Sequence, residues 1–335
     1  MAVLSTAALT LADWAKRLDP DGKTPAIVEM LNQTNEVLSD MQFIEGNLPT
    51  GHRTTIRTGL PSVAWRLLNS GIQPSKSTTA QVDEACGMLE AFSIVDKDLA
   101  LLNGNTAQFR MSEAQAFVES MNQAFCQALF YGNASTAPEQ FNGLSVRYSS
   151  LSASVANSKN VISGGGSGAD NTSIWLVVWG PNTCHGIFPK GSKAGLNHED
   201  LGETTIENAN GVTGARMRAY EDHWQFKSGI ALKDWRYVTR IANIDISNLT
   251  SKSGAADLQE LMIRAIHRIP NLGMGKPVFY VNRTVRQMLD IQRRDDVQSG
   301  GSLVYNDVDG KLIPAFRGIP VRVCDALLET ESVVS

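Results

Sequence analysis

The chain has little that would support metal binding, secretion or membrane insertion. Its four cysteines, Cys86, Cys126, Cys184 and Cys324, form no CxxC pair and no metal-ligand spacing. We therefore expect reduced, mostly buried thiols. No basic start precedes an apolar core and no long apolar run occurs, so we predict neither a signal peptide nor a transmembrane segment. The chain is expected to fold in a cytoplasm.

The basic excess typical of nucleic-acid-binding proteins is also missing. The formal net charge is −4, with 30 Lys and Arg against 34 Asp and Glu. Proteins that grip DNA need a positive surface that displaces counterions from phosphates, so any contact with DNA should be weak and non-specific. At 335 residues, with 42% apolar and 19% charged residues, the chain can fold into two connected globular lobes.

A third absence is local, because residues 46–82 contain no Asp or Glu. Four cations give this stretch a charge of +4 within an acidic protein. Alternation suggests one strand around Thr54 and Ile56 and a second around Trp65 and Leu67, on either side of Gly59–Pro61. They would form a long β-hairpin with few residues for a core of its own. Such charge segregation requires an acidic partner surface. The contact candidates are Arg53, Arg57, Trp65, Arg66 and Lys76.

Three clusters that resemble reactive motifs lack the rest of the motif. Glycines at 164, 165, 166 and 168 are followed by no Lys-Ser or Lys-Thr and by a predicted strand where a phosphate loop needs a helix. Cys184 and His185 are adjacent in an extended segment, so their side chains point to opposite faces. His198-Glu199-Asp200 has no HExxH spacing. We predict no catalytic, cofactor-binding or metal site, with an unrecognised hydrolytic or transferase site as the alternative.

Helices and buried strands follow from periodicity. Ser112 and Gln115 form a capping box, and apolar residues then recur every three or four positions until Gly132. Two further helices are predicted over 257–269, before Pro270, and over about 283–292. Continuous apolar runs predict two buried strands, and alternating apolar residues predict two further strands. These strands cover residues 88–95, 174–179, 278–281 and 319–324.

The longest strand signal runs from Thr213 to Ile246. Trp224, Phe226, Ile230 and Leu232 share one face, and after a slip of one residue at Lys233-Asp234 the alternation continues on the other face. Fully extended, residues 219–246 would span roughly 90 Å, far beyond an ordinary strand. The alternative is two strands joined at Ser228-Gly229.

Several blocks of this chain, in order, resemble the major capsid proteins of tailed double-stranded DNA bacteriophages, in particular the short-tailed epsilon-fifteen-like group. The most telling block is Gly229–Tyr237 followed by Ile241–Asp245. Others are Thr172–Gly180, Gly186–Ser192 and Phe316–Asp325. Together they cover most of residues 50–330.

This resemblance implies an α+β fold of the Hong Kong 97 type, with an N-terminal arm, an extended β-hairpin loop, a peripheral domain with a long spine helix and long strands, and an axial domain. The implied boundaries are 1–45 for the arm, 46–95 for the loop and return strand, 96–141 and 213–246 for the peripheral domain, 142–212 and 247–315 for the axial domain, and 316–335 for the C-terminal strand and tail.

The function implied by the resemblance is structural: self-assembly through pentamers and hexamers into an icosahedral shell around double-stranded DNA. Implied partners are further copies of the chain, a scaffolding protein, a portal, a cementing or decoration protein, and weakly contacted DNA, without a membrane. The implied location is the virion capsid, assembled in the host cytoplasm. The alternative is a nanocompartment shell of the same fold that packages proteins.

On this reading the acid-free hairpin lies on a neighbouring subunit, where it gains strand pairing, apolar burial and opposite charge together. Two acidic strips are candidates to receive it. One contains Asp83, Glu84 and Glu90, and the other contains Glu199, Asp200, Glu203 and Glu207.

Overall fold

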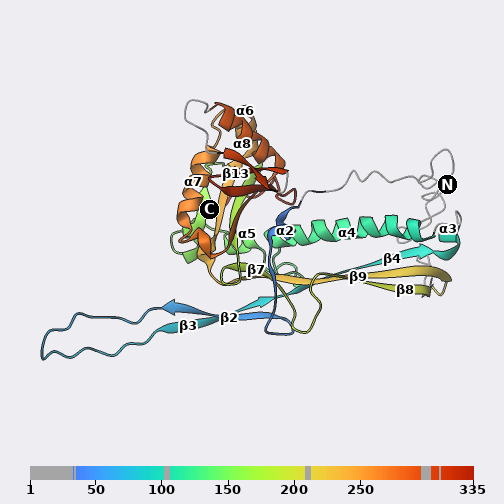
Figure 1. The fold of residues 1–335 in the computed structure, drawn as a ribbon, viewed down its shortest axis with the longest axis horizontal. Coiled ribbons are helices and arrows are strands. Elements are labelled where there is room, and N and C mark those ends of the chain that lie inside the picture. The colour runs from blue at the N-terminus through green and yellow to red at the C-terminus, as the bar shows by residue number, and fades with distance from the viewer. Residues whose placement is uncertain (1–32, 34, 102–105, 208–212, 296–302, 309–310) are drawn as a thin grey trace. The chain divides into compact units, whose positions relative to one another are not determined.

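The computed structural model describes residues 33, 35–101, 106–207, 213–295, 303–308 and 311–335, so most of the predicted arm lies outside the described residues (Figure 1). Contacts divide the chain into two units. The first contains residues 1–35, 88–127 and 195–227, and the second contains 36–87, 128–194 and 228–335. This division groups 195–207 with 88–127, whereas the capsid-type domain boundaries above remain a prediction.

The first unit is a sheet of three strands covered by a helix. The strand order is β4 (Gly87–Asp96), β9 (Arg216–Leu232) and β8 (Leu196–Glu207). β8 runs antiparallel to β9, from Leu196 opposite Phe226 to Glu207 opposite Arg216. The return strand expected at 88–95 is therefore confirmed as β4. β8 was not predicted, because its exposed polar residues have no apolar alternation.

Two helices follow β4, namely α3 (Lys97–Leu101) and the 26-residue α4 (Thr106–Tyr131). α4 ends before Gly132 as predicted, but it begins six residues earlier than Ser112. The predicted capping box is wrong, because the Ser112 hydroxyl lies inside the helix and donates to the Phe109 carbonyl (2.8 Å). Phe125 of α4 packs edge-to-face on Phe226 of β9, with ring centroids 4.9 Å apart. α4 thus covers the face of the sheet that carries the even-numbered residues of β9.

The second unit is organised around β6 (Asn171–Trp179), whose nine residues are all buried. Aromatic and β-branched residues favour a strand here, and burial of every residue means that both faces are covered. The strands on one side of β6 are, in order, β11 (Lys276–Val281), β14 (Ile319–Val323), β13 (Lys311–Phe316) and β12 (Leu303–Val308). β10 (Val238–Asp245) also pairs with β6, and β5 (Val161–Ser163) pairs with β10. At its end β6 pairs with β7 (Cys184–Phe188), and β7 pairs with β1 (Phe43–Glu45).

Helices cover one face of this sheet (Figure 1), namely α6 (Ile246–Ser251), α7 (Leu258–Arg268) and α8 (Arg283–Asp295). Ile174, Leu176 and Val178 of β6 share one apolar core with their buried residues. On the opposite face, the Trp175 ring packs against two other aromatic rings. The ring centroids are 6.0 Å apart for Phe130, at the end of α4, and 6.1 Å apart for Tyr148, just after α5 (Leu144–Arg147). The predicted helices at 257–269 and 283–292 and the strands at 174–179, 278–281 and 319–324 are confirmed.

The predicted hairpin exists, but its strands are shorter than expected. β2 (Gly51–Gly59) pairs antiparallel with β3 (Thr78–Ala85), and residues 60–77 between them contain no strand (Figure 1). The strand predicted around Trp65 and Leu67 is therefore wrong. The alternation rule presupposes a surface for one face of the strand to pack against, and no described residue covers these two exposed side chains.

The long strand signal proves to be two strands. β9 ends at Leu232 and β10 begins at Val238, separated by a 3-10 turn at Trp235–Tyr237. The break falls where the alternation slips, and the alternative junction at Ser228-Gly229 is wrong. Gly229 stays in the strand opposite Ile187, and a Cβ at this position would lie 2.6 Å from the Ala85 carbonyl oxygen. Glycine is needed there for close backbone approach and not for a bend.

The segment that precedes the hairpin is fastened to the second unit by a buried carboxylate. Asp40 closes the short helix α2 (Val37–Asp40) and accepts from Lys276 Nζ (2.6 Å) and the Tyr280 hydroxyl (3.1 Å). Arg322 of β14 also reaches this carboxylate (3.3 Å) and pairs with Glu36 (2.8 Å). Opposite charge therefore compensates the burial of Asp40.

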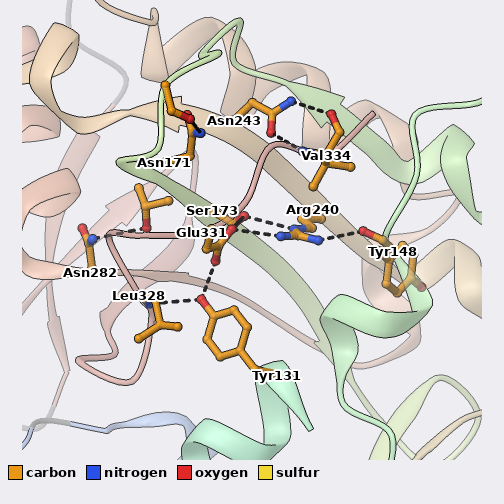
Figure 2. A network of polar contacts seen from close by, with 12 residues as sticks. Tyr131, Tyr148, Asn171, Ser173, Arg240, Asn243, Asn282, Leu328, Glu331 and Val334 are labelled. Carbon is orange, nitrogen blue, oxygen red and sulfur yellow. Dashed lines mark hydrogen bonds and ion pairs between the residues drawn. The ribbon is translucent and has the colours of Figure 1, made fainter. Parts of the chain in front are cut away.

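The C-terminal segment lies across the face of β6 opposite the helices and is held by a buried polar network (Figure 2). Glu331 pairs with Arg240 Nη2 (2.9 Å) and accepts from the hydroxyls of Tyr131 and Ser173. Arg240 also donates to the Tyr148 carbonyl (2.9 Å) and lies over the Trp175 ring. Burial and the Glu331 charge raise the pKa of Tyr131, so its hydroxyl remains a donor.

Asn243 completes this attachment from a left-handed conformation (φ 57°) at an irregularity of β10. Its amide donates to the Val334 carbonyl and accepts from the Val334 N–H, both at 2.8 Å. The Asn243 side chain thus pairs with the backbone of Val334 as a residue of a neighbouring strand would. The last five residues are therefore bound by Glu331 at one end and by Asn243 near the other.

Replacing Glu331 with Leu should lower the free energy of unfolding by about 3–5 kcal/mol, because it leaves the Arg240 guanidinium buried without its partner. Urea denaturation of the purified protein measures this. The double variant Arg240→Met/Glu331→Leu should recover much of the loss, and Ser332→Ala, an exposed neighbour, should change little. Equal losses in the single and double variants would contradict the assigned role of the ion pair.

Candidate assembly interface

The loop at the end of the hairpin is an exposed apolar segment. Val63 and Leu68 are 92% and 93% exposed, and Trp65 is fully exposed. We call residues 60–72 the hairpin tip; its exposed large apolar side chains are Leu60, Val63, Trp65, Leu67, Leu68 and Ile72. A concentration of exposed apolar side chains is unfavourable in water and is typical of surfaces that take part in protein–protein contacts. Of these residues, only Trp65 was among the contact candidates, although six large apolar residues within an acid-free stretch would have indicated the rest.

The cations of the hairpin differ in how they are balanced. Arg53 forms a bidentate pair with Asp83 across the two strands, with both N···O distances at 2.6 Å. Arg57, Arg66 and Lys76 form no ion pair with any of the residues that the structure describes. The charge of Arg53 is therefore satisfied within the hairpin, while three positive charges near the tip remain uncompensated.

Most of the acids proposed to receive the hairpin are already paired within the chain. Glu84 is buried and bonded to Arg147 (Nη2–Oε2 2.6 Å), and Asp83 is held by Arg53. In the second strip, Asp200 pairs with Arg110, Glu203 with Lys97 and Arg218, and Glu207 with Arg216, at 2.6–2.8 Å. These carboxylates cannot supply uncompensated charge to a partner. Glu90 and Glu199 are the two members without a Lys or Arg partner among the described residues.

Glu90 and Glu199 lie on the same face of the first unit, the face opposite α4. Met88, Glu90 and Phe92 alternate on the outer face of β4. Phe92 stacks on His223 of β9 at 4.5 Å, and His223 lies opposite Glu199 of β8. We call these five residues the acidic face. Met88 and Phe92 are half exposed, so it combines apolar surface with negative charge.

The other face of the same strands is satisfied internally. Asp222 accepts from Arg110 (2.8 Å) and faces His198 Nε2 (3.0 Å), while the His198 ring stacks on Trp224 at 4.0 Å. Asp200 thus pairs with Arg110 of α4, and the His198 ring contacts Asp222 of β9. Within the described part of the chain, no group of three or more His, Cys, Asp or Glu side chains is placed to hold a metal ion.

The remaining reactive-looking motifs are also engaged in the fold. Burial raises the pKa of the Cys184 thiol to about 12, so it stays protonated and is a poor nucleophile. In the glycine tract, the amides of Gly164 and Gly166 donate to carbonyls of β10 at 2.7 and 2.8 Å and are not open to a phosphate. No described helix has both the length and the apolarity needed to cross a bilayer.

The root of the hairpin rests on a contact between two histidines, half-buried His52 and buried His185. His52 of β2 packs edge-to-face on His185 of β7, with ring centroids 5.9 Å apart. His185 is fully buried, and burial together with Lys233 and His52 lowers its pKa to about 4. Glu84, the nearby carboxylate, is bonded to Arg147. Both rings are therefore neutral at pH 7.

Comparisons with known proteins bear on this arrangement. A family model described as "Major capsid protein GP7" matches residues 19–335. A chain of the bacteriophage Epsilon15 structure is 32% identical, with a TM-score of 0.78 over 100% of this chain and 99% of that chain. A search among curated proteins found no match.

Two further structures are only distantly similar, with low sequence identity and TM-scores below 0.5. A chain from Microbacterium phage Oxtober96 has 10% identity and a TM-score of 0.45, covering 69% of this chain and 98% of that chain. The SrpI encapsulin complex from Synechococcus elongatus PCC 7942 has 9% identity and a TM-score of 0.43, covering 70% of this chain and 96% of that chain.

Acidification should loosen the hairpin root. The pKa of His185 lies below the value of 6.5 expected in the unfolded chain, so the unfolded state binds the proton first and stability falls as the pH drops from about 6.5 to 4. We expect protonation of His185 to lower the free energy of unfolding by about 2–3 kcal/mol over this pH range. His185→Phe keeps a ring and should remove that share of the pH dependence in urea titrations at pH 7 and pH 4. His267→Gln, at an exposed histidine, should behave as wild type, and an identical slope in the His185 variant would refute the assignment.

Proposed function

The chain belongs to the major capsid protein GP7 family, and from this premise we propose that its hairpin joins copies of the chain into pentamers and hexamers, which close into an icosahedral shell around double-stranded DNA. The protein is a structural component of a capsid shell with an α+β, Hong Kong 97-type fold, and its place is the virion capsid. The resemblance inferred from the sequence is thereby confirmed. The proposal concerns which surfaces make the contacts and what the shell encloses.

The observation that carries the proposal is the hairpin tip together with its three uncompensated cations. Burying a large apolar side chain contributes about 1.5–3 kcal/mol, so covering six contributes roughly 10–15 kcal/mol before losses. Association alone costs an estimated 4–15 kcal/mol. The net free energy of a single hairpin contact is therefore close to zero. A closed ring, in which each copy gives one contact and receives another, is favoured.

We assign the acidic face of a neighbouring copy as the receiving surface. Met88 and Phe92 offer apolar area, and Glu90 and Glu199 offer negative charge that no Lys or Arg of the described chain satisfies. Arg66 and Lys76 supply the matching positive charge. Of the five contact candidates, Arg57, Trp65, Arg66 and Lys76 fit this role, while Arg53 is held by Asp83 and serves the hairpin itself.

Several wider features belong to the same proposal. A net charge of −4 suits a container that does not trap its DNA on the inner wall, so contact with the genome is weak and non-specific. The protein acts without catalysis, and its buried, protonated thiols are consistent with this. Assembly takes place in the host cytoplasm with a scaffolding protein, a portal and a cementing or decoration protein.

The direct test is analytical ultracentrifugation with electron microscopy on the chain expressed alone and with its candidate scaffold. Five- and six-membered rings or closed shells are expected. A stable monomer or dimer under both conditions would overturn the proposal. Nuclease-protected DNA in shells formed in an infected host is expected, whereas protein cargo without DNA would favour a nanocompartment.

The contact itself is tested by a charge swap. Arg66→Glu/Lys76→Glu should abolish shells while the subunit remains folded, because the exchanged charges repel the acidic face. Glu90→Lys/Glu199→Lys should do the same from the other side. Combining all four changes should restore shells, which electron microscopy can count.

The matched control is Lys190→Glu/Lys193→Glu, two exposed lysines on a loop away from the tip, which should assemble normally. Failure of the combined variant to assemble, with wild-type shells intact, would reject the acidic face as the receiver and leave the capsid function untouched. Normal shells from Arg66→Glu/Lys76→Glu would reject the role of the tip cations.

A further inference from the structure

A groove runs along the side of β2 that faces away from β3. Seven consecutive residues, Thr54–Leu60, line one wall, and Asn182 with Lys233, Asp234, Trp235 and Arg236 line the other. Its volume is about 700 Å³. Because one wall is an unbroken stretch of strand, the groove follows β2 for roughly 20 Å at about 3.3 Å per residue. Both walls belong to the second unit.

The strand edge in this groove is open. β2 pairs with β3 and with no other described strand. At Arg53, one residue before the groove begins, the Asn47 side chain occupies the edge of β2: its Oδ1 accepts from the Arg53 N–H (2.7 Å) and its Nδ2 donates to the Arg53 carbonyl (2.8 Å). Asn47 therefore imitates one residue of a neighbouring strand.

Beyond Asn47, no residue that the structure describes pairs with the same edge. Backbone N–H and C=O groups of alternate residues point to the same side of a strand, so those of Thr55 and Arg57 point out as those of Arg53 do. Unpaired edge groups of this kind are a template for another strand. We infer that the groove is a docking site in which an acidic, extended segment of a second protein adds to β2 as a third strand.

The charge of the groove selects an acidic occupant. Asp234 is its sole carboxylate and is bonded to Arg236 (2.6 Å). Arg57 has no carboxylate partner in the described chain, and Lys233 Nζ donates to the Pro181 carbonyl (2.7 Å), which leaves its charge unbalanced. The groove thus carries two uncompensated positive charges. Half-buried Ile56 and Trp235 add apolar surface for an alternating side chain.

We assign the occupant to a separate polypeptide, because the acidic strands that the structure describes are already paired. Asp83 and Glu84 of β3 and Asp200, Glu203 and Glu207 of β8 lie in paired strands and in ion pairs. The groove meets the hairpin tip at Leu60 and shares Arg57 with the proposed tip contact, but its second wall, Asn182 and residues 233–236, lies outside the tip. A segment bound here would hold β2 to Trp235 and Arg236 and so stiffen the hairpin relative to the rest of the second unit.

The probe for the test is a fluorescein-labelled peptide, acetyl-Glu-Val-Glu-Val-Glu-Thr-Glu-amide, and the readouts are fluorescence anisotropy and hydrogen exchange. Two proteins are used, wild-type shells and the unassembled Arg66→Glu/Lys76→Glu subunit. Binding with slowed exchange in residues 54–59 is expected in both. If the unassembled subunit still binds the peptide, the groove works independently of the proposed tip contact, so the two proposals can fail separately.

Variants and control peptides decide the mode of binding. Lys233→Glu should weaken peptide binding about tenfold, whereas Lys190→Glu should leave it unchanged. A peptide with Lys in place of Glu, and one N-methylated at alternate residues so that it cannot pair as a strand, should not bind. Equal binding by all peptides, or no effect of Lys233→Glu, would overturn the proposal. Slowed exchange of residues 54–59 in wild-type shells before peptide is added would also overturn it, because a second copy would then fill the groove.

Discussion

The requirement that β6 be covered on both faces governs the second unit. All nine of its residues are buried, so no part of the strand can face water. The three helices after β10 and β11 cover one face, and the end of α4, Tyr148 and the C-terminal segment cover the other. The polar network around Arg240 and Glu331 exists because a charged residue of β10 lies on this second face, where it needs a partner brought from the far end of the chain.

The hairpin depends on this body for its position, because a two-stranded ribbon is marginally stable by itself. It is fastened at its root by the Glu84–Arg147 pair, by the contact of His52 with His185, and by close backbone approach at Gly229. The preceding segment is held by Asp40. Attachment at one end and an exposed apolar tip at the other are what the proposed role of the hairpin as a connector between molecules requires.

Most acids of the two strips described above are neutralised by cations of the same chain. Five of the seven acids first considered as receivers are paired in this way, and this pairing leaves Glu90 and Glu199 with half-exposed Met88 and Phe92. Internal neutralisation has a physical consequence for specificity. A partner with uncompensated cations meets uncompensated acids at one face and balanced surface elsewhere, which favours a single mode of docking.

The sequence by itself determined the elements whose signal is local. These include the apolar periodicity of α4 and α7, the continuous apolar runs of β6 and β11, and the acid-free composition of residues 46–82. It also identified the family through ordered blocks. Tertiary structure decided which acids are available, because a carboxylate at position 84 or 200 is neutralised by an arginine distant in sequence. It also decided the role of Gly229 and the attachment of the last residues by Arg240 and Asn243. Each of these depends on contacts between residues far apart along the chain, which no local pattern encodes.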